Sequence, residues 1–215
     1  MDLFSQNEGF SKLSYEELKQ HAQTCTKCQL HKTRTKVVFG NGPIPCDLML
    51  IGEGPGEQED LSGLPFVGRA GQLLTKIFES VGIDREKEVY IANTVKCRPP
   101  ENRAPLQIET ETCWPYLEAQ IRLVNPKIIL LAGAPAVKVV LKTDEGMTKL
   151  RGKWFKFPGT NIDVMPIFHP AFLLRNPSKE VGKPKWQTWQ DMKEVKNALD
   201  FFCKINLLET ENPKS

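Results

Sequence analysis

The chain lacks the segments that would anchor it in a membrane. It has no run of about 18 apolar residues, and its first eight residues have neither a basic start nor an apolar stretch. Internal repeats, low-complexity segments and linkers are absent as well. We therefore expect a cytoplasmic protein with no membrane partner. We expect one domain over residues 1–215, with flexible ends at about 1–11 and 207–215.

The chain also has little net charge. The 29 Lys and Arg residues and 26 Asp and Glu residues leave a net charge of only +3. This charge permits a nucleic-acid partner through local basic patches at 32–36 and 149–156, but it does not require one. A composition of 40% hydrophobic and 26% charged residues is typical of a soluble globular protein that needs no disulfides.

Four of the six cysteines form two pairs. Cys25 and Cys28 have two residues between them, and Cys97 and Cys113 have fifteen. In a reducing compartment such thiols seldom form disulfides, and four of them suit a structural zinc ion or an iron-sulfur cluster. The second Cys-x-x-Cys knuckle of a zinc ribbon is absent. Spacing alone therefore leaves zinc, iron and unliganded core cysteines open.

Hydrophobic patterning predicts an α/β fold. Continuous apolar runs predict strands near 48–51, 89–97, 127–132 and 162–168, and helical periodicity predicts helices between and after them. The capping-box spacing of Ser14 and Glu17 predicts a further helix over 14–24. This alternation favours a single domain with a central four-stranded parallel sheet flanked by helices on both faces. Further residues are predicted to lie in the core, namely Cys46, Cys203, Trp186, Trp189, Met192, Val195, Leu199 and Phe202.

The first strand stops at a segment rich in glycine and carboxylates, Gly52 to Asp60. Ligands of open α/β sheets bind outside the carboxyl ends of the strands, although an acidic surface turn would have the same composition. Four strand ends, at Glu53, Asn93, Gly133 and His169, are expected at one edge of the sheet. Three of these residues are polar, which predicts a functional site there.

Four motifs in order carry a resemblance to a known family. They are Gly52-Glu-Gly-Pro-Gly-Glu-Gln-Glu-Asp60, Gly63-Leu-Pro-Phe-Val-Gly-Arg-Ala-Gly71, Asn93-Thr-Val-Lys-Cys-Arg-Pro-Pro-Glu-Asn-Arg103 and His169-Pro-Ala-Phe-Leu-Leu-Arg-Asn176. From about residue 12 to 200 the chain resembles the family 4 uracil-DNA glycosylases. The family more often has Ala where this chain has Gly54. The basic, His-containing loop of the covalently uracil-binding relatives is missing, and the branch active mainly on double strands lacks the Gly-Glu opening.

The resemblance implies an activity and assigns roles. The expected enzyme is a monofunctional hydrolase of DNA base excision repair, which releases uracil and leaves an abasic site. A 4Fe-4S cluster would be held by Cys25, Cys28, Cys97 and Cys113. Catalysis is expected from His169, which would donate to uracil O2, and from a carboxylate, in the order Glu53, Glu59, Glu57. Substrate binding is expected from Gly54, Gly56, Glu57, Phe66 and Asn93, with Phe66 stacking on uracil and Asn93 pairing with its Watson-Crick edge.

The segment 172–175 suggests how DNA is held. Its apolar tip beside a cation suits a wedge that fills the gap left by an extruded base, so DNA contacts are expected from Leu173, Arg175 and Asn176. A Phe66 or Phe172 in the core and an Asn93 in an ordinary turn remain alternatives. The expected partner is uracil-containing DNA, single- or double-stranded, bound by a monomer. Two other functions remain open, a non-catalytic iron-sulfur module that binds nucleic acid and an electron-transfer protein.

Overall fold

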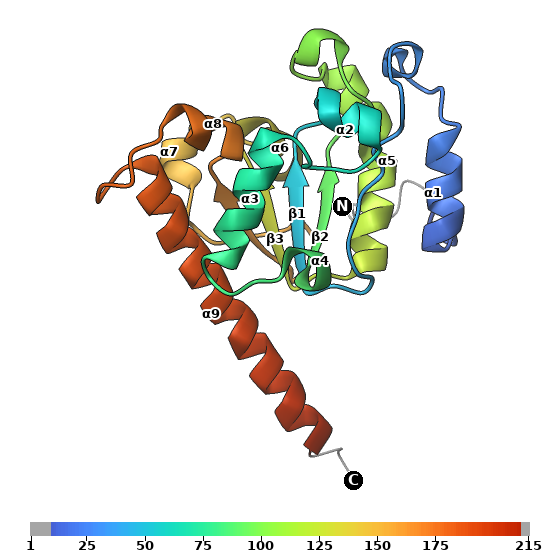
Figure 1. The fold of residues 1–215 in the computed structure, drawn as a ribbon. Helices are drawn as coiled ribbons and strands as arrows, with labels where there is room; N and C mark the ends of the chain where they lie inside the picture. Colours follow the sequence, from blue (N-terminus) through green and yellow to red (C-terminus); the bar gives the residue numbers. More distant parts are fainter. Residues whose placement is uncertain (1–9, 212–215) are drawn as a thin grey trace.

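The computed structural model describes residues 10–211, with side chains up to residue 204. A five-stranded sheet in the order β2-β1-β3-β5-β4 lies at its centre (Figure 1). The strands are β1 (Leu48–Gly52), β2 (Val89–Asn93), β3 (Ile128–Ala132), β4 (Phe155–Lys156) and β5 (Asp163–Ile167). The four predicted strands pair in parallel, which confirms the expected class. The added edge strand β4 is antiparallel to β5, and its two residues are too few to show a period in the sequence.

Helices and short 3-10 turns connect the strands. Before β2 these are α1 (Tyr15–Gln23), η2 (Gln29–Lys32), α2 (Glu57–Ser62), α3 (Arg69–Glu79) and α4 (Arg85–Glu88). After β2 they are η3 (Pro100–Asn102), α5 (Gln107–Val124), α6 (Ala134–Leu141), α7 (Met147–Leu150), α8 (Pro170–Arg175) and α9 (Pro184–Glu211). Among the residues described, no helix is long and apolar enough to cross a membrane.

Alternate residues of the strands face two separate cores. Met49 and Ile51 point toward a cluster that includes Leu117 of α5 and Val137 of α6. Leu48 and Leu50 point the other way, to a cluster formed with helices α3 and α9. Every residue of β1, β2 and β3 is buried. Covering both faces explains why these strands appear in the sequence as continuous apolar runs.

An N-terminal layer packs on the far side of α5. The helix α1 begins at the predicted capping box, in which Ser14 and Glu17 bond each other's backbone N–H groups. Phe10 is buried, with its ring centroid 4.8 Å from that of Tyr116. The expected flexible start therefore does not extend to Phe10, and α9 continues past residue 207. The expectations for 1–9 and 212–215 lie outside the described residues.

Several local predictions were wrong. The second strand ends at Asn93 instead of Cys97. Its neighbour β1 ends at Gly52, whose O takes the last ladder bond from Thr94 N–H, and beyond it Lys96 O bonds Val38 N–H outside the sheet. Cys203 is exposed, whereas Cys46 is buried as expected. Trp189 is 40% exposed, and its ring lies 4.5 Å from the Lys193 ammonium on the solvent side of α9. Helical periodicity places a residue on a stripe, but the width of the covering core decides whether its side chain is enclosed.

Candidate active site at the carboxyl edge of the sheet

The carboxyl ends of the parallel strands meet at one edge of the sheet, as predicted. Gly52 of β1 pairs in register with Asn93 of β2. On the other side of β1, the backbone N–H of Gly133, after β3, donates to Ile167 O at the end of β5, 3.0 Å away. His169 lies two residues beyond the end of β5 and caps α8. The strand order thus brings Glu53, Asn93 and His169 to a common edge.

The side chains of Asn93 and Phe66 meet over Gly52. A Cβ atom on Gly52 would lie 2.5 Å from Asn93 Oδ1 and 2.7 Å from Phe66 Cζ, so only glycine fits here. Asn93 is 1% exposed, and its Oδ1 has no hydrogen-bond partner in the described structure. A buried acceptor without a donor is unfavourable and rare. Asn93 Oδ1 is therefore available to a donor that a ligand brings.

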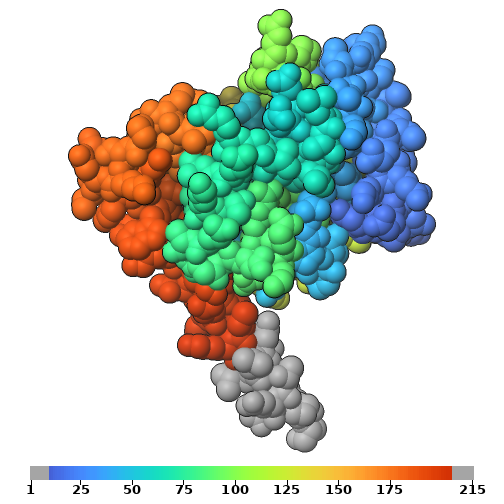
Figure 2. Space-filling view, in the orientation of Figure 1, coloured from blue at the N-terminus to red at the C-terminus, as the bar shows by residue number. Residues whose placement is uncertain are grey.

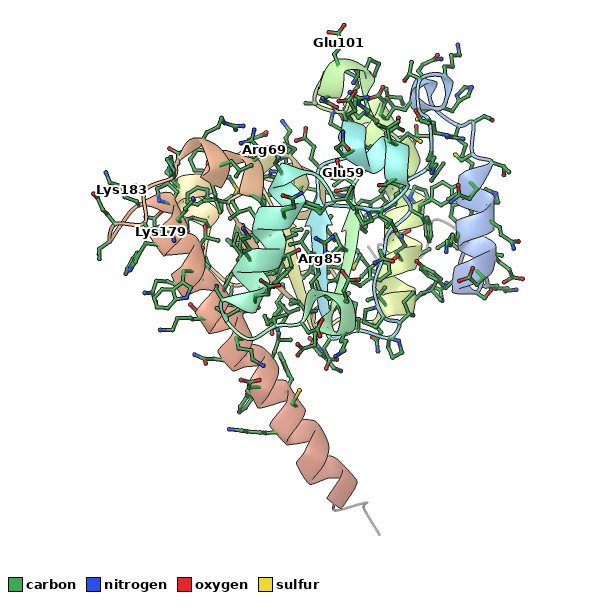
Figure 3. The ribbon with its side chains drawn as sticks, in the orientation of Figure 1. Glu59, Arg69, Arg85, Glu101, Lys179 and Lys183 are labelled. Carbon is green, nitrogen blue, oxygen red and sulfur yellow. The ribbon has the colours of Figure 1, made fainter. Side chains whose placement is uncertain are left out.

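Glu59 holds the turn that carries Phe66. Its Oε1 accepts from the backbone N–H groups of Val67 and Gly68, both at 2.9 Å, and its Oε2 accepts from that of Gly56 at 3.2 Å. Three backbone donors thus occupy the carboxylate that was expected to be an alternative catalytic group. The geometry instead makes Glu59 a brace between α2 and the start of α3 (Figure 3).

Arg85 braces the same turn from α4, and sequence reasoning did not identify it. Its guanidinium donates to Pro65 O at 2.9 Å and to Gly71 O at 3.3 Å, next to α3 (Figure 3). Phe66 has a positive φ of 54°, which is unfavourable for a non-glycine residue. A Cβ on Gly71 would lie 1.8 Å from Phe66 O, so the turn requires glycine there. Phe66 is thus held in a strained conformation by contacts on both sides.

His169 presents a neutral imidazole with a defined tautomer. Its Nδ1 accepts from the backbone N–H of Ala171 at 3.1 Å, so the proton of the neutral ring resides on Nε2. Burial, followed by the positive charge of Arg175, lowers the pKa of His169 to about 4. Gly133 has a φ of 91°, and a Cβ there would lie 3.0 Å from His169 Cβ. The site therefore offers an Nε2–H donor that stays neutral near pH 7.

Glu53 is the carboxylate left available at this edge. Partial burial raises the pKa of Glu53, and among the described residues its carboxylate has no hydrogen-bond or ion-pair partner. Its backbone O is fixed by the N–H of Val95 at 3.3 Å and by the Thr94 hydroxyl. The side chain also lines an open groove between α5 and α6. Glu57, by contrast, is exposed and lies 3.9 Å from the Arg98 guanidinium.

The segment expected to form an apolar loop is the short helix α8. Leu173, which was expected to contact DNA, is only 1% exposed and faces the core, whereas Leu174 is 36% exposed. Arg175 is exposed, and Asn176 donates from Nδ2 to Phe172 O at 2.9 Å. The helical turn therefore presents Leu174, one residue later than expected, beside Arg175.

Exposed cations lie along the same side as α8. Arg69 at the start of α3 and Lys179 and Lys183 after α8 all project outward (Figure 3). Figure 2 shows the segments that carry them, coloured teal and orange, on one face of the molecule. Sequence reasoning did not single out these cations, because charged residues are common on any solvated surface.

The four paired cysteines line one cavity between the N-terminal layer and α5. Arg34 donates to Cys97 Sγ at 3.2 Å and to Cys25 O at 2.8 Å. Burial raises the pKa of the Cys113 thiol to about 12 when no metal is present. In the described part of the chain, no group of three or more His, Cys, Asp or Glu side chains is placed to hold a metal ion. The four cysteines nevertheless line the walls of the same cavity.

Comparisons with known proteins agree with the motifs. The model of the uracil DNA glycosylase superfamily matches residues 39–193. A type-4 uracil-DNA glycosylase of Thermotoga maritima is 46% identical over 169 residues, covering 78% of this chain and 87% of the relative. Type-4 enzymes of Sulfurisphaera tokodaii and Saccharolobus solfataricus are each 42% identical, covering 77% and 81% of this chain and 78% and 82% of their own lengths. The chain belongs to the uracil DNA glycosylase superfamily and, within it, to the type-4 uracil-DNA glycosylases.

Proposed function

We propose that this protein removes uracil from DNA by hydrolysing the N-glycosidic bond, leaving an abasic site. The observation that carries the proposal is the unpartnered Asn93 Oδ1, buried over Gly52 beside the rings of Phe66 and His169. Such a site offers one acceptor, one aromatic face and one neutral donor. A uracil extruded from the DNA stack would satisfy all three.

Asn93 and Phe66 would recognise the base. The amide can accept from uracil N3–H through Oδ1 and donate to O4 through Nδ2. The Phe66 ring would stack on the base, since an extruded base is held by aromatic contacts. The backbone at Gly54 and Gly56, together with Glu57, would close the other side of the pocket. This arrangement supports selection of uracil by hydrogen bonds and shape.

His169 and Glu53 would carry the chemistry. Cleavage of the C1'–N1 bond leaves negative charge on uracil O2, which the fixed Nε2–H of His169 would stabilise. The sugar develops positive character, which a carboxylate stabilises while it orients the attacking water. Glu53 suits this role because its carboxylate oxygens have no partner within residues 10–204, whereas those of Glu59 are taken by the backbone. We therefore assign Glu59 to positioning instead of catalysis.

The surface around α8 would bind the DNA strand. Leu174 and Arg175 are placed to enter the gap left by the base and to contact a phosphate. Arg69, Lys179 and Lys183 would contact neighbouring phosphates. We propose that the protein acts as a monomer.

We further propose that Cys25, Cys28, Cys97 and Cys113 hold a 4Fe-4S cluster. Their donor set fits such a group, because four thiols line a single cavity. Three cations, Lys27, Arg34 and the buried Lys96, also line it and would offset the negative charge of thiolate ligands. When bound, the cluster would cross-link the N-terminal segment to α5 and the sheet. Iron with acid-labile sulfide in the purified protein supports this proposal, and zinc would contradict it.

The activity is tested with purified protein and matched oligonucleotides containing U, T, C or hypoxanthine at one position. Single and double strands are compared, and alkali-labile sites are counted alongside release of the free base. Uracil release with no thymine release supports the proposal. DNA binding without any base release would favour a non-catalytic module, and reversible reduction without release would favour electron transfer.

A further inference from the structure

Lys96 is a buried lysine with an unusual environment. It is 2% exposed, yet among the described residues no Asp or Glu forms an ion pair with it. An isolated buried ammonium is costly, so buried lysines are ordinarily paired or neutral. A charged Lys96 would therefore need a partner other than a carboxylate.

Cysteines share the cavity that Lys96 lines. All four paired cysteines line it, and Lys96 directly precedes Cys97 in the chain. No Asp or Glu is among the described residues that line this cavity. Neutral thiols would leave the ammonium unbalanced, whereas thiolates that ligate iron would balance it.

Lys96 also contacts Asn93, the residue proposed to recognise uracil. Its Nζ donates to the backbone O of Asn93 at 2.7 Å, in a buried hydrogen bond. Asn93 ends β2, and the next residue, Thr94, is bonded through its N–H to Gly52 O at 2.9 Å. The ammonium therefore fixes the turn that aims the Asn93 amide over Gly52.

We propose that Lys96 is a positioning residue that links the cysteine site to uracil recognition. Thiolates at Cys97 and Cys113 balance the ammonium, and the ammonium holds the Asn93 carbonyl, which sets the direction of the Asn93 side chain. The inference rests on the proposed function, including the cluster. It gives the cysteine site a role in base selection besides the cross-linking of the N-terminal segment.

The test compares Lys96→Met with Arg34→Gln in the iron-loaded protein. Each substitution removes one cation beside Cys97, but only Lys96 contacts Asn93, because Arg34 donates to Cys97 Sγ and to the backbone O atoms of Cys25 and Gln23. Four properties are measured for both variants. They are iron and sulfide content, the reduction potential, inhibition by free uracil, and kcat/KM for excision of uracil and of cytosine.

Both substitutions should lower the reduction potential, since a nearby cation favours the more negative, reduced state. Only Lys96→Met should weaken inhibition by free uracil and lower kcat/KM for uracil, each roughly ten- to hundredfold, the value of a hydrogen bond to a charged group. Its preference for uracil over cytosine should also narrow, whereas Arg34→Gln is expected to keep the wild-type preference.

Uracil inhibition and base preference that match between Lys96→Met and Arg34→Gln would overturn the inference. If Lys96→Met loses its iron, Lys96→Arg decides. If Lys96→Arg retains iron, the result supports charge pairing between residue 96 and the cysteines. If both Lys96 variants lose iron, the inference is overturned, because the shape of the lysine side chain and not its charge would then be what iron binding requires. A wild-type protein that releases no uracil would refute the proposed function itself, which separates the two failures.

Discussion

The rings of Phe66 and His169 lie 5.7 Å apart, centroid to centroid, with their planes inclined at 34°. The two residues come from the turn before α3 and from the end of β5, and each is held by the backbone around it. Packed rings and fixed turns lose little conformational freedom when a ligand binds. The stacking ring and the hydrogen-bond donor are therefore held in place before uracil arrives.

His169→Ala should lower the single-turnover rate of uracil excision about a hundredfold or more and change DNA binding little. The reason is that the Nε2–H donor acts on charge that forms only in the transition state. Rapid-quench rates and binding to an uncleavable uracil analogue in DNA measure the two effects. Equal losses in rate and in binding would mean that His169 only positions the substrate.

His169 should also make stability depend on pH. Its pKa is about 4 in the folded protein, below the ordinary value of 6.5, so between these values the unfolded chain binds more protons. The free energy of unfolding should therefore rise with pH between about 4 and 6.5. The contribution that neutral His169 makes to it should be lost as the pH falls toward 4. Urea unfolding of wild type and His169→Gln at several pH values measures the difference, which should be largest below pH 5.

Substitutions of Glu53 and Glu59 should affect different properties, the rate of excision and the stability of the fold. Glu53→Gln should slow excision about a hundredfold without loss of stability, because its carboxylate has no partner among the described residues. Glu59→Gln should lower the urea midpoint, because hydrogen bonds from three backbone N–H groups to a charged acceptor are weakened. The raised pKa of Glu53 also predicts that excision falls as pH drops through a value above 4.5. The opposite pattern would return Glu59 to the catalytic role.

Asn93→Asp should cut uracil excision sharply and admit a little cytosine. A carboxylate only accepts hydrogen bonds, so it suits the N4 amino group of cytosine better than uracil O4. A site built on buried hydrogen bonds can discriminate by roughly ten-thousandfold, because the wrong partner leaves polar groups unpaired. Excision of U and C from matched oligonucleotides is the measurement. Near-native uracil activity would remove Asn93 from the pocket.

Substitution of a cysteine that lines the cavity should release iron, whereas substitution of a cysteine elsewhere should not. Cys97→Ala should lose iron and lower the melting temperature, because the cluster would cross-link the N-terminal layer to α5. Cys46→Ala is the matched control, since Cys46 is also buried but donates to the backbone O atoms of Leu48 and Glu88 and does not line the cysteine cavity. About four irons per wild-type chain are expected. Iron lost equally from both variants would contradict the assignment of ligands.

Adjacent leucines of α8 should behave differently. Leu174→Ala should reduce excision from double strands more than from single strands, with stability unchanged, because only a paired duplex leaves a gap for a wedge to fill. Leu173→Ala should lower stability by about 2–5 kcal/mol, as expected for a core leucine. Excision assays on both substrates and urea unfolding test the pair. Loss of duplex activity only in the Leu173 variant would refute the exposed wedge.

The sequence by itself determined the parts of the protein that depend on local pattern. Continuous apolar runs predicted the four parallel strands, and the capping pattern at Ser14 and Glu17 predicted the start of α1. The strand ends placed Glu53, Asn93 and His169 at one edge, because parallel strands must end on the same side of a sheet. The cysteine spacing left zinc, iron and unliganded core cysteines open, and the family resemblance assigned the four cysteines to one cluster.

The tertiary structure alone decided which polar groups are occupied. Nothing local distinguishes Glu59 from Glu53, but Glu59 bonds the distant turn at Val67 and Gly68, whereas the Glu53 carboxylate has no partner in the part of the chain that the structure describes. Arg85 and Lys96 likewise acquire their roles only when segments far apart in the chain meet. A residue type specifies its donors and acceptors, but its partners depend on packing between elements. For that reason the sequence could predict the site, and only the fold could separate its catalytic groups from those that position them.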